Sequence, residues 1–269
     1  FNLKSKSMKT IKLMFIVLFC STMVWAQSEK RLSIPLIGSE APSFKANSTD
    51  GVIKFPKDFG DSWKILYSHP KDFTPVCTSE IIELAHLQDE FNARDVKVAV
   101  ISTDNVTQHQ SWKGFMERAK YKDRDPVKIN FPLFEDVNGA VSIKYGMLHE
   151  IPGSDRNIRG VYIIDSENVV RSINFYPVEI GRNMDEILRT VVALQTSDKE
   201  KVLTPANWNE GDDVITRGRQ YRLSDYEANP EKYDKEYYSL ENMIWFKRGS
   251  GAITLQSSDV SGKPTPENK

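Results

Sequence analysis

Residues 63 to 88, with the sequence WKILYSHPKDFTPVCTSEIIELAHLQ, contain the transition that decides the fold. The first six of these residues are largely apolar and predict a buried strand. From Thr78 to Ala93, apolar side chains recur at helical spacing, which predicts a helix. Cys77 stands between the two elements, where the predicted helix begins.

The alternation of strands and helices continues to about residue 198. Further elements are predicted at regular intervals: strands over 97–102 and 131–134, and helices over 106–120, 138–145 and 184–195. The apolar runs 160–165 and 169–175 flank a polar turn and predict a β-hairpin. This order of elements predicts an α/β sandwich of the thioredoxin type.

The composition changes after Thr196, where Pro, Trp and several Tyr residues accompany mixed charges with weak periodicity. This change indicates a second unit. We predict a thioredoxin-fold domain over 33–198, a smaller C-terminal domain over 199–250 and a disordered tail over 251–269.

The first residues have the three-part layout of a secretory signal peptide. A short basic start (8–12) precedes an apolar run (13–19), and Val24 and Ala26 are small residues at the −3 and −1 positions of a cleavage site. We therefore predict a signal peptide over 1–26 and export to the periplasm or out of the cell. An uncleaved N-terminal anchor is the alternative, although the apolar run is short for a bilayer.

The bulk composition excludes some classes of partner. The 269 residues are 39% hydrophobic and 27% charged, as in globular proteins with a real core. A formal net charge of −1 without a long basic block argues against nucleic acid. Cleavage after Ala26 would remove four lysines and no acids, changing the charge from −1 to −5. That charge argues against an anionic membrane surface, and we expect no stable membrane insertion after cleavage.

Cleavage would also remove Cys20, so Cys77 would be the one thiol left. A lone thiol in an exported protein is paired with another chain, buried and inert, or reactive. The unpaired N–H groups and the dipole at a helix start make a thiol easier to ionise, and the thiolate is the nucleophile. Glu80 stands where a Cys-x-x-Cys oxidoreductase needs its second thiol. The spacing alone leaves the reactive and the structural interpretations of Cys77 open.

Pro70, Thr74 and Cys77 form the P-x-x-x-T-x-x-C pattern of the peroxiredoxins, and the string HPKDFTPVCTSE resembles the 1-Cys, peroxiredoxin-6-like subfamily. The segments 159–165 and 176–186 resemble the strand that carries the family's arginine and the start of its last core helix. Residues from Thr204 to Asp212 resemble the start of its C-terminal domain. The resemblance covers about 33–215.

The resemblance implies a thiol-dependent peroxidase that reduces hydrogen peroxide and organic hydroperoxides through a cysteine sulfenic acid, which an external thiol returns to the thiol state. It assigns roles by position: Cys77 as the peroxidatic cysteine, Thr74 and Arg159 as its partners in substrate binding and the transition state, and Pro70 as a shield. We expect supporting roles for His69, Glu80 and Arg182.

The resemblance also implies no metal and no organic cofactor, and the four histidines are scattered along the sequence without ligand-type spacing. It implies a homodimer, extended in some members to a ring of dimers. The alternative that uses the same thiol is a non-enzymatic redox sensor or a holdase-like protein.

Overall fold

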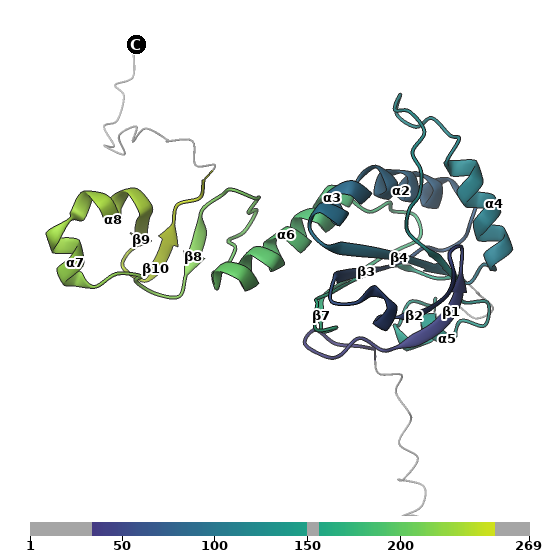
Figure 1. Cartoon of the computed structure of the whole chain (residues 1–269), viewed down its shortest axis with the longest axis horizontal. Helices are drawn as coiled ribbons and strands as arrows, with labels where there is room; N and C mark the ends of the chain where they lie inside the picture. Colours follow the sequence, from purple (N-terminus) through teal and green to yellow (C-terminus); the bar gives the residue numbers. More distant parts are fainter. Residues whose placement is uncertain (1–33, 150–155, 251–269) are drawn as a thin grey trace, which may run out of the picture.

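The computed structural model describes residues 34–149 and 156–250, and its main body is a mixed sheet with helices on both faces (Figure 1). The sheet has seven strands in the order β2-β1-β5-β4-β3-β6-β7. These strands are β1 (Phe44–Ser48), β2 (Gly51–Phe55), β3 (Trp63–Ser68), β4 (Val96–Ser102), β5 (Leu133–Glu135), β6 (Arg159–Ile164) and β7 (Val170–Tyr176). β3, β4 and β5 are parallel, and the other neighbours pair antiparallel. The predicted thioredoxin-like α/β fold is confirmed.

Helices cover the sheet on both sides. They are η1 (Lys57–Phe59), α2 (Pro75–His86), α3 (Gln88–Ala93), α4 (Val106–Met116), α5 (Ala140–Lys144) and α6 (Met184–Glu200). One buried cluster joins α2, α3, α4 and α6 to the sheet, and a second joins α5 and the β1–β2 hairpin to its other face. Because β3 and β4 are covered on both faces, their sequences are nearly continuous apolar runs.

The side chains of β3 alternate between the two clusters. Ile65 and Tyr67 face the layer of α2, α4 and α6, whereas Leu66 faces the layer of α5. All three side chains are fully buried. Cys77 belongs to the first cluster, so Tyr67 and Cys77 lie in the same layer.

The helix predicted over residues 78 to 93 is two helices, and it begins earlier than predicted. α2 starts at Pro75, because proline lacks the N–H that a first helical residue leaves unpaired and its φ suits the first turn. The helical path changes at Leu87, which separates α2 from α3. α4 ends at Met116 and α6 continues to Glu200, so the first is shorter and the second longer than predicted.

The C-terminal residues form a smaller unit, here called the arm, that stands apart from the sheet at the far end of α6 (Figure 1). It contains β8 (Val214–Thr216), α7 (Leu223–Ala228), α8 (Pro230–Glu236), β9 (Tyr237–Leu240) and β10 (Ile244–Lys247), with the sheet order β8-β10-β9. Trp208 and Val214 pack against Val192 of α6 and fasten the base of the arm. The predicted C-terminal unit is therefore present.

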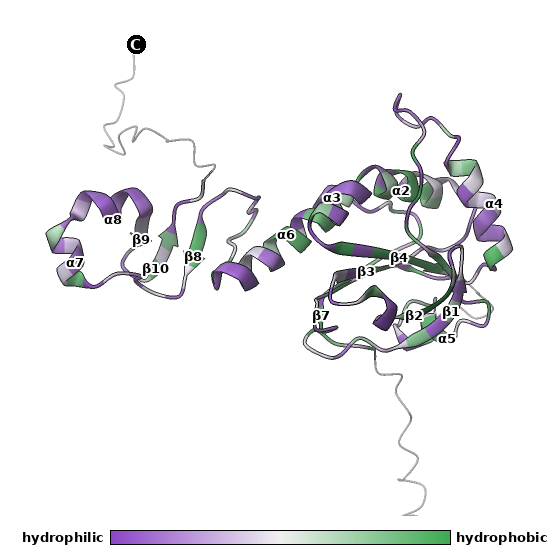
Figure 2. Cartoon of the chain, viewed as in Figure 1, coloured by the Kyte–Doolittle hydropathy of each residue, from purple (hydrophilic) through white to green (hydrophobic). Residues whose placement is uncertain are grey.

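Polarity differs between the elements of the arm. β8 is hydrophobic, while α8 is mostly hydrophilic (Figure 2). Neither α7 nor α8 contains a buried residue. The arm thus has little core of its own.

The predicted signal peptide (1–26) and tail (251–269) lie outside the described residues. Within the ranges 34–149 and 156–250, no helix has both the length and the apolar character needed to cross a membrane.

Candidate active site

Cys77 is the third residue of α2 and is fully buried. Thr74 is the N-cap residue, and its carbonyl accepts the N–H of Thr78 at 2.9 Å. The thiol therefore lies in the first helical turn, where unpaired N–H groups and the helix dipole favour negative charge.

The guanidinium of Arg159 contacts the sulfur directly. Arg159 Nη1 lies 3.3 Å from Cys77 Sγ and 2.8 Å from Glu80 Oε2. Its Nε and Nη2 donate to the carbonyl of Val178, in the loop between β7 and α6. Arg159 is held from two sides, so one edge of its guanidinium faces the thiol.

Glu80 lies one turn after Cys77 and joins Arg159 to a second arginine. Glu80 Oε1 accepts the backbone N–H of Arg182 at 2.8 Å and Arg182 Nε at 2.9 Å, and Glu80 Oε2 accepts Arg182 Nη2 at 2.7 Å. Arg182 Nη1 donates to the carbonyls of Ser68 and Gly160. These bonds connect the loop before α6 to the end of β3 and the start of β6.

The charges of this buried cluster do not balance while the thiol is neutral. The side chains of Glu80, Arg159 and Arg182 are at most 3% exposed, and they carry one negative and two positive charges. A thiolate at Cys77 would bring the sum to zero. The cluster therefore places one net positive charge next to the sulfur.

Glu80 remains a carboxylate in this site. Burial by itself raises the pKa of Glu80, but the hydrogen bonds and charge of Arg182 outweigh burial and hold that pKa below its ordinary value. The two arginines therefore face a fixed anion.

Gly160 allows Arg159 to take its place at the start of β6. A Cβ on Gly160 would meet Ser68 Oγ at 3.0 Å and Met147 Cγ at 3.1 Å. The N–H of Gly160 donates to Ser68 Oγ at 2.8 Å, and that hydroxyl donates to the carbonyl of Ile158. A side chain at this position would force its neighbours to shift by a few tenths of an ångström, so glycine suits this close approach of β6 to β3.

A buried cluster of His69, Asp72 and His109 anchors the loop before α2. His69 Nε2 lies 2.8 Å from Asp72 Oδ1, and His109 Nδ1 lies 2.8 Å from Asp72 Oδ2. Although His69 and His109 are far apart along the sequence, they lie close together in space, because the fold brings α4 against this loop. The expectation of scattered histidines is therefore wrong for these two residues. The potential ligand atoms of the three residues lie within 4.8 Å of one another, but the three groups already hydrogen-bond each other.

Burial and hydrogen bonding shift the pKa values of His69 and Asp72. Burial lowers the pKa of His69, although Asp72 opposes the shift. Burial raises the pKa of Asp72, but hydrogen bonds from His109 and His69 outweigh it and lower that pKa overall. A neutral His69 beside an ionised Asp72 follows from these shifts.

Two predicted site residues lie in the same loop with less direct geometry. Pro70 is buried, as a shield for the sulfur requires. The hydroxyl of Thr74 donates to the carbonyl of Lys71 at 2.9 Å, so its proton points to the loop and must turn to reach an oxygen at the sulfur. Phe73 has a positive φ of 57° and is 51% exposed, which places an aromatic ring at the surface beside this loop.

Comparisons with known protein families agree with this geometry. The model of the AhpC/TSA family matches residues 37–173, which contain Cys77, Glu80 and Arg159. The chain belongs to the peroxiredoxin family. The model of the C-terminal domain of 1-Cys peroxiredoxin matches residues 193–218, at the base of the arm.

Individual peroxiredoxins resemble the chain over most of its length. A peroxiredoxin of Methanosarcina mazei is 44% identical over 214 residues, which are 79% of this chain and 96% of the relative. The mitochondrial peroxiredoxin PRX1 of Saccharomyces cerevisiae is 42% identical over 186 residues, covering 66% of this chain and 69% of the relative.

Solved structures give the same result. A yeast mitochondrial 1-Cys peroxiredoxin, studied for thiol resolution through glutathione and thioredoxin systems, superposes with a TM-score of 0.68 at 36% identity and covers 80% of this chain and 100% of its own. Peroxiredoxin 6 of Arenicola marina has a TM-score of 0.67 at 28% identity, over 81% of this chain and 99% of its own. This peroxiredoxin is therefore a thiol-dependent peroxidase of the 1-Cys type, acting on hydroperoxides with a thiol reductant.

The structure brings together four predicted residues, Cys77, Glu80, Arg159 and Arg182, in one hydrogen-bonded cluster. Sequence reasoning missed the residues that position them, above all Asp72, His109 and Gly160. For Gly160, the sequence offers one signal, a glycine inside a predicted apolar strand directly after the candidate Arg159. For Asp72 and His109, no local pattern exists, because 37 residues separate them.

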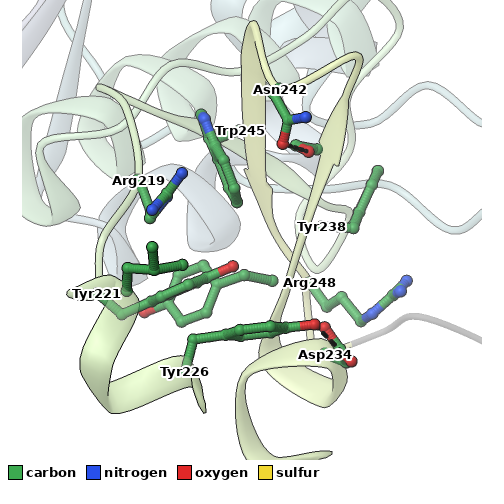
Figure 3. A pocket seen from close by; sticks show the side chains of 11 residues that line it. Arg219, Tyr221, Tyr226, Asp234, Tyr238, Asn242, Trp245 and Arg248 are labelled. Atoms are coloured by element: carbon green, nitrogen blue, oxygen red, sulfur yellow. Dashed lines mark hydrogen bonds between the residues drawn. The ribbon is translucent and has the colours of Figure 1, made fainter. Parts of the chain in front are cut away.

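The arm of this peroxiredoxin contains a pocket of about 430 Å³ that is distinct from the cysteine site (Figure 3). Aromatic rings of Tyr221, Tyr226 and Trp245 line it. Arg219 lies over the Trp245 ring at 5.2 Å, and Arg248 lies over the Tyr238 ring at 4.7 Å. These stacked rings and arginines replace an aliphatic core in the arm.

Proposed function

We propose that Cys77 performs the peroxidase reaction, with Arg159 as the main partner of the reacting oxygens. The observation that carries the proposal is the 3.3 Å contact between Arg159 Nη1 and Cys77 Sγ inside a buried cluster that lacks one negative charge. The thiolate attacks the nearer peroxide oxygen, the O–O bond breaks, and the alkoxide or hydroxide leaves and takes up a proton. Arg159 donates to the oxygens while that charge develops, which lowers the barrier.

Thr74 and Pro70 complete the proposed site. Rotation of the Thr74 hydroxyl away from the Lys71 carbonyl would aim a second donor at the peroxide. The buried ring of Pro70 limits water at the sulfur. His69, fixed by Asp72, is proposed as a support of this loop.

The decisive experiment is peroxide consumption with a small-thiol reductant, comparing the wild type with Cys77→Ser. We expect activity far above that of a free thiol in the wild type and none above background in the variant. Equal rates in both proteins would refute the role of Cys77. Wild-type rates close to those of a free thiol, with sulfenic acid still trapped at Cys77, would favour a redox sensor.

We propose that the reductant is a thiol from outside the chain, either glutathione or a thioredoxin-type protein, because the yeast relative is described with both systems. The sulfenic acid would condense with one thiol, releasing water and leaving a mixed disulfide. A second thiol would then release Cys77 and carry away the disulfide. Peroxide turnover measured with glutathione and with a thioredoxin-type protein separately tests the choice. If neither reductant supports turnover, both candidates are refuted.

We propose that the active form is a homodimer in which the arm packs on a second copy. The arm supports this, because Met243 is 84% exposed and Leu223 and Leu240 are more than half exposed. Its two helices have no buried residue. Native mass measurement should give twice the chain mass, and Met243→Asp with Leu240→Asp should shift the population to monomer. A monomeric wild type at micromolar concentration would refute the proposal.

We propose that the protein is exported after removal of residues 1–26, on the basis of the basic, apolar and small-residue layout alone. Mass spectrometry of the protein from the producing cells should give an N-terminus at Gln27. A chain that retains its first 26 residues would contradict cleavage.

A further inference from the structure

Tyr67 lies directly beneath the charged cluster but belongs to none of the roles assigned so far. It is a fully buried residue of β3 in the same layer as Cys77. The guanidinium carbon of Arg182 lies 3.3 Å from the centroid of the Tyr67 ring. The guanidinium of Arg182 is therefore in contact with the face of the Tyr67 ring.

The ring contact has an electrostatic consequence. Arg182 is the second of two buried cations that share the single anion Glu80. The face of an aromatic ring carries partial negative charge and attracts a guanidinium, most strongly where water is excluded. Tyr67 thereby holds Arg182 in the plane from which it donates to Glu80.

The hydroxyl of Tyr67 is a separate observation. It is buried and has no hydrogen-bond partner among the described residues. The pKa of Tyr67 is raised well above its ordinary value, chiefly by burial and further by the neighbouring Glu80 carboxylate, while Arg182 and Arg159 oppose the shift. The hydroxyl therefore keeps its proton and is a donor near Glu80 that makes no hydrogen bond of ordinary geometry. A buried donor without a partner is unfavourable and gains from any acceptor that turns towards it.

Arg159 Nη1 serves two acceptors at once, Cys77 Sγ and Glu80 Oε2. When Nη1 turns towards a peroxide oxygen, its bond to Glu80 weakens, and the carboxylate needs another donor. We propose that Tyr67 is a positioning residue of the peroxidase site, whose ring holds Arg182 and whose hydroxyl bonds Glu80 while Arg159 donates to the peroxide. The inference rests on the proposed function of Cys77 and Arg159.

Two variants separate the ring from the hydroxyl. Tyr67→Phe keeps the stacking surface and removes only the donor, so we expect the second-order rate constant for peroxide to fall about 3- to 10-fold, the effect of about one hydrogen bond. Tyr67→Leu also removes the stacking, and we expect a loss of about 10- to 100-fold. In Tyr67→Leu, the midpoint pH for alkylation of Cys77 should also rise, because loss of the ring under Arg182 loosens the cluster that holds Arg159 at the sulfur, whereas Tyr67→Phe should keep the wild-type midpoint.

Tyr162→Phe is the matched control. Tyr162 is a fully buried tyrosine of β6 in the other layer, and its hydroxyl donates to the carbonyl of Tyr145 at 2.6 Å. This variant should lower the melting temperature without moving the rate constant or the alkylation midpoint. Rate constants and midpoints equal to wild type in both Tyr67 variants would overturn the proposal, whatever happens to their stability.

The readouts also separate this inference from the function of Cys77. If Cys77→Ser keeps full activity, the proposed function fails, and the alkylation midpoint of the Tyr67 variants still tests whether Tyr67 acts on the thiol. If Cys77→Ser is inactive and both Tyr67 variants match wild type, only the role of Tyr67 fails.

Discussion

Replacement of Glu80 by glutamine tests the buried charge cluster most directly. The carboxylate accepts four hydrogen bonds, three from Arg182 and one from Arg159, at 2.7 to 2.9 Å. Glutamine has nearly the same shape, but its NH₂ group would face arginine donors and its neutral amide would leave two buried cations without a counter-charge. Removing one partner of a buried ion pair costs about 3–5 kcal/mol.

The expected loss is large compared with the total stability of a domain, which is of the order of 5–15 kcal/mol. Urea unfolding of Glu80→Gln should therefore give a midpoint well below that of wild type with a similar slope. Arg159 would also lose its anchor, and we expect the peroxide rate constant to fall about 10²-fold, as when a preorganised donor is lost. Glu186→Gln is the control, because Glu186 forms a half-exposed pair with Arg189 that contributes about 0–1 kcal/mol.

The pH dependence supplies a second test of the same cluster. The pKa of Glu80 is below its ordinary value of about 4.5, so its contribution to stability is complete above pH 4.5 and is lost as the pH falls through the lowered pKa. Glu80→Gln should remove this part of the acid sensitivity. A loss of less than about 1 kcal/mol together with an unchanged acid profile would refute the reasoning that Glu80 is the counter-ion of two arginines.

Three further predictions follow from the same contacts. Gly160→Ala places a Cβ 3.0–3.1 Å from three side-chain atoms and should cost about 1–3 kcal/mol in urea unfolding. Gly114→Ala, in a helix where the new Cβ would make only an ordinary contact with Arg118 Nη1 at 3.5 Å, should stabilise by about 0.5–1 kcal/mol. Equal effects would contradict the close approach at Gly160. Because the pKa of His69 is lowered, its contribution to stability is present above pH 6.5 and is lost as the pH falls from 6.5 through the lowered pKa. His69→Asn should therefore flatten this part of a curve of unfolding free energy against pH. An unchanged curve would count against a buried neutral His69. Thr74→Val should reduce the peroxide rate constant about 10- to 100-fold while Thr74→Ser keeps most of it, and similar activity in both would exclude the hydroxyl from the reaction.

Local sequence patterns predicted most elements of the core. The strand over 63–68 has the same limits in the structure, because a strand covered on both faces must be apolar throughout. The start of α2 was placed three residues late, since apolar periodicity begins after the first turn and Pro75 has no place in that period. The β1–β2 hairpin was not predicted, because each strand has only five residues and the alternation of partly buried and exposed side chains is therefore short.

The sequence by itself determined the α/β class, the position of Cys77 at a helix start and, through the P-x-x-x-T-x-x-C pattern, the family. These features are local, so spacing along the chain is sufficient to find them. Only the tertiary structure decided which groups surround the sulfur. It brought Arg159 and Arg182 to Glu80 from about 80 to 100 residues away, paired His69 with His109 through Asp72, and placed Tyr67 under Arg182. The physical reason is that a buried charge needs its partners in space, and the register of β3 with β6 and the loop before α6 supply those partners. Local sequence thus places Cys77 at the start of its helix, while the charged residues around its sulfur are brought together only by the folded sheet.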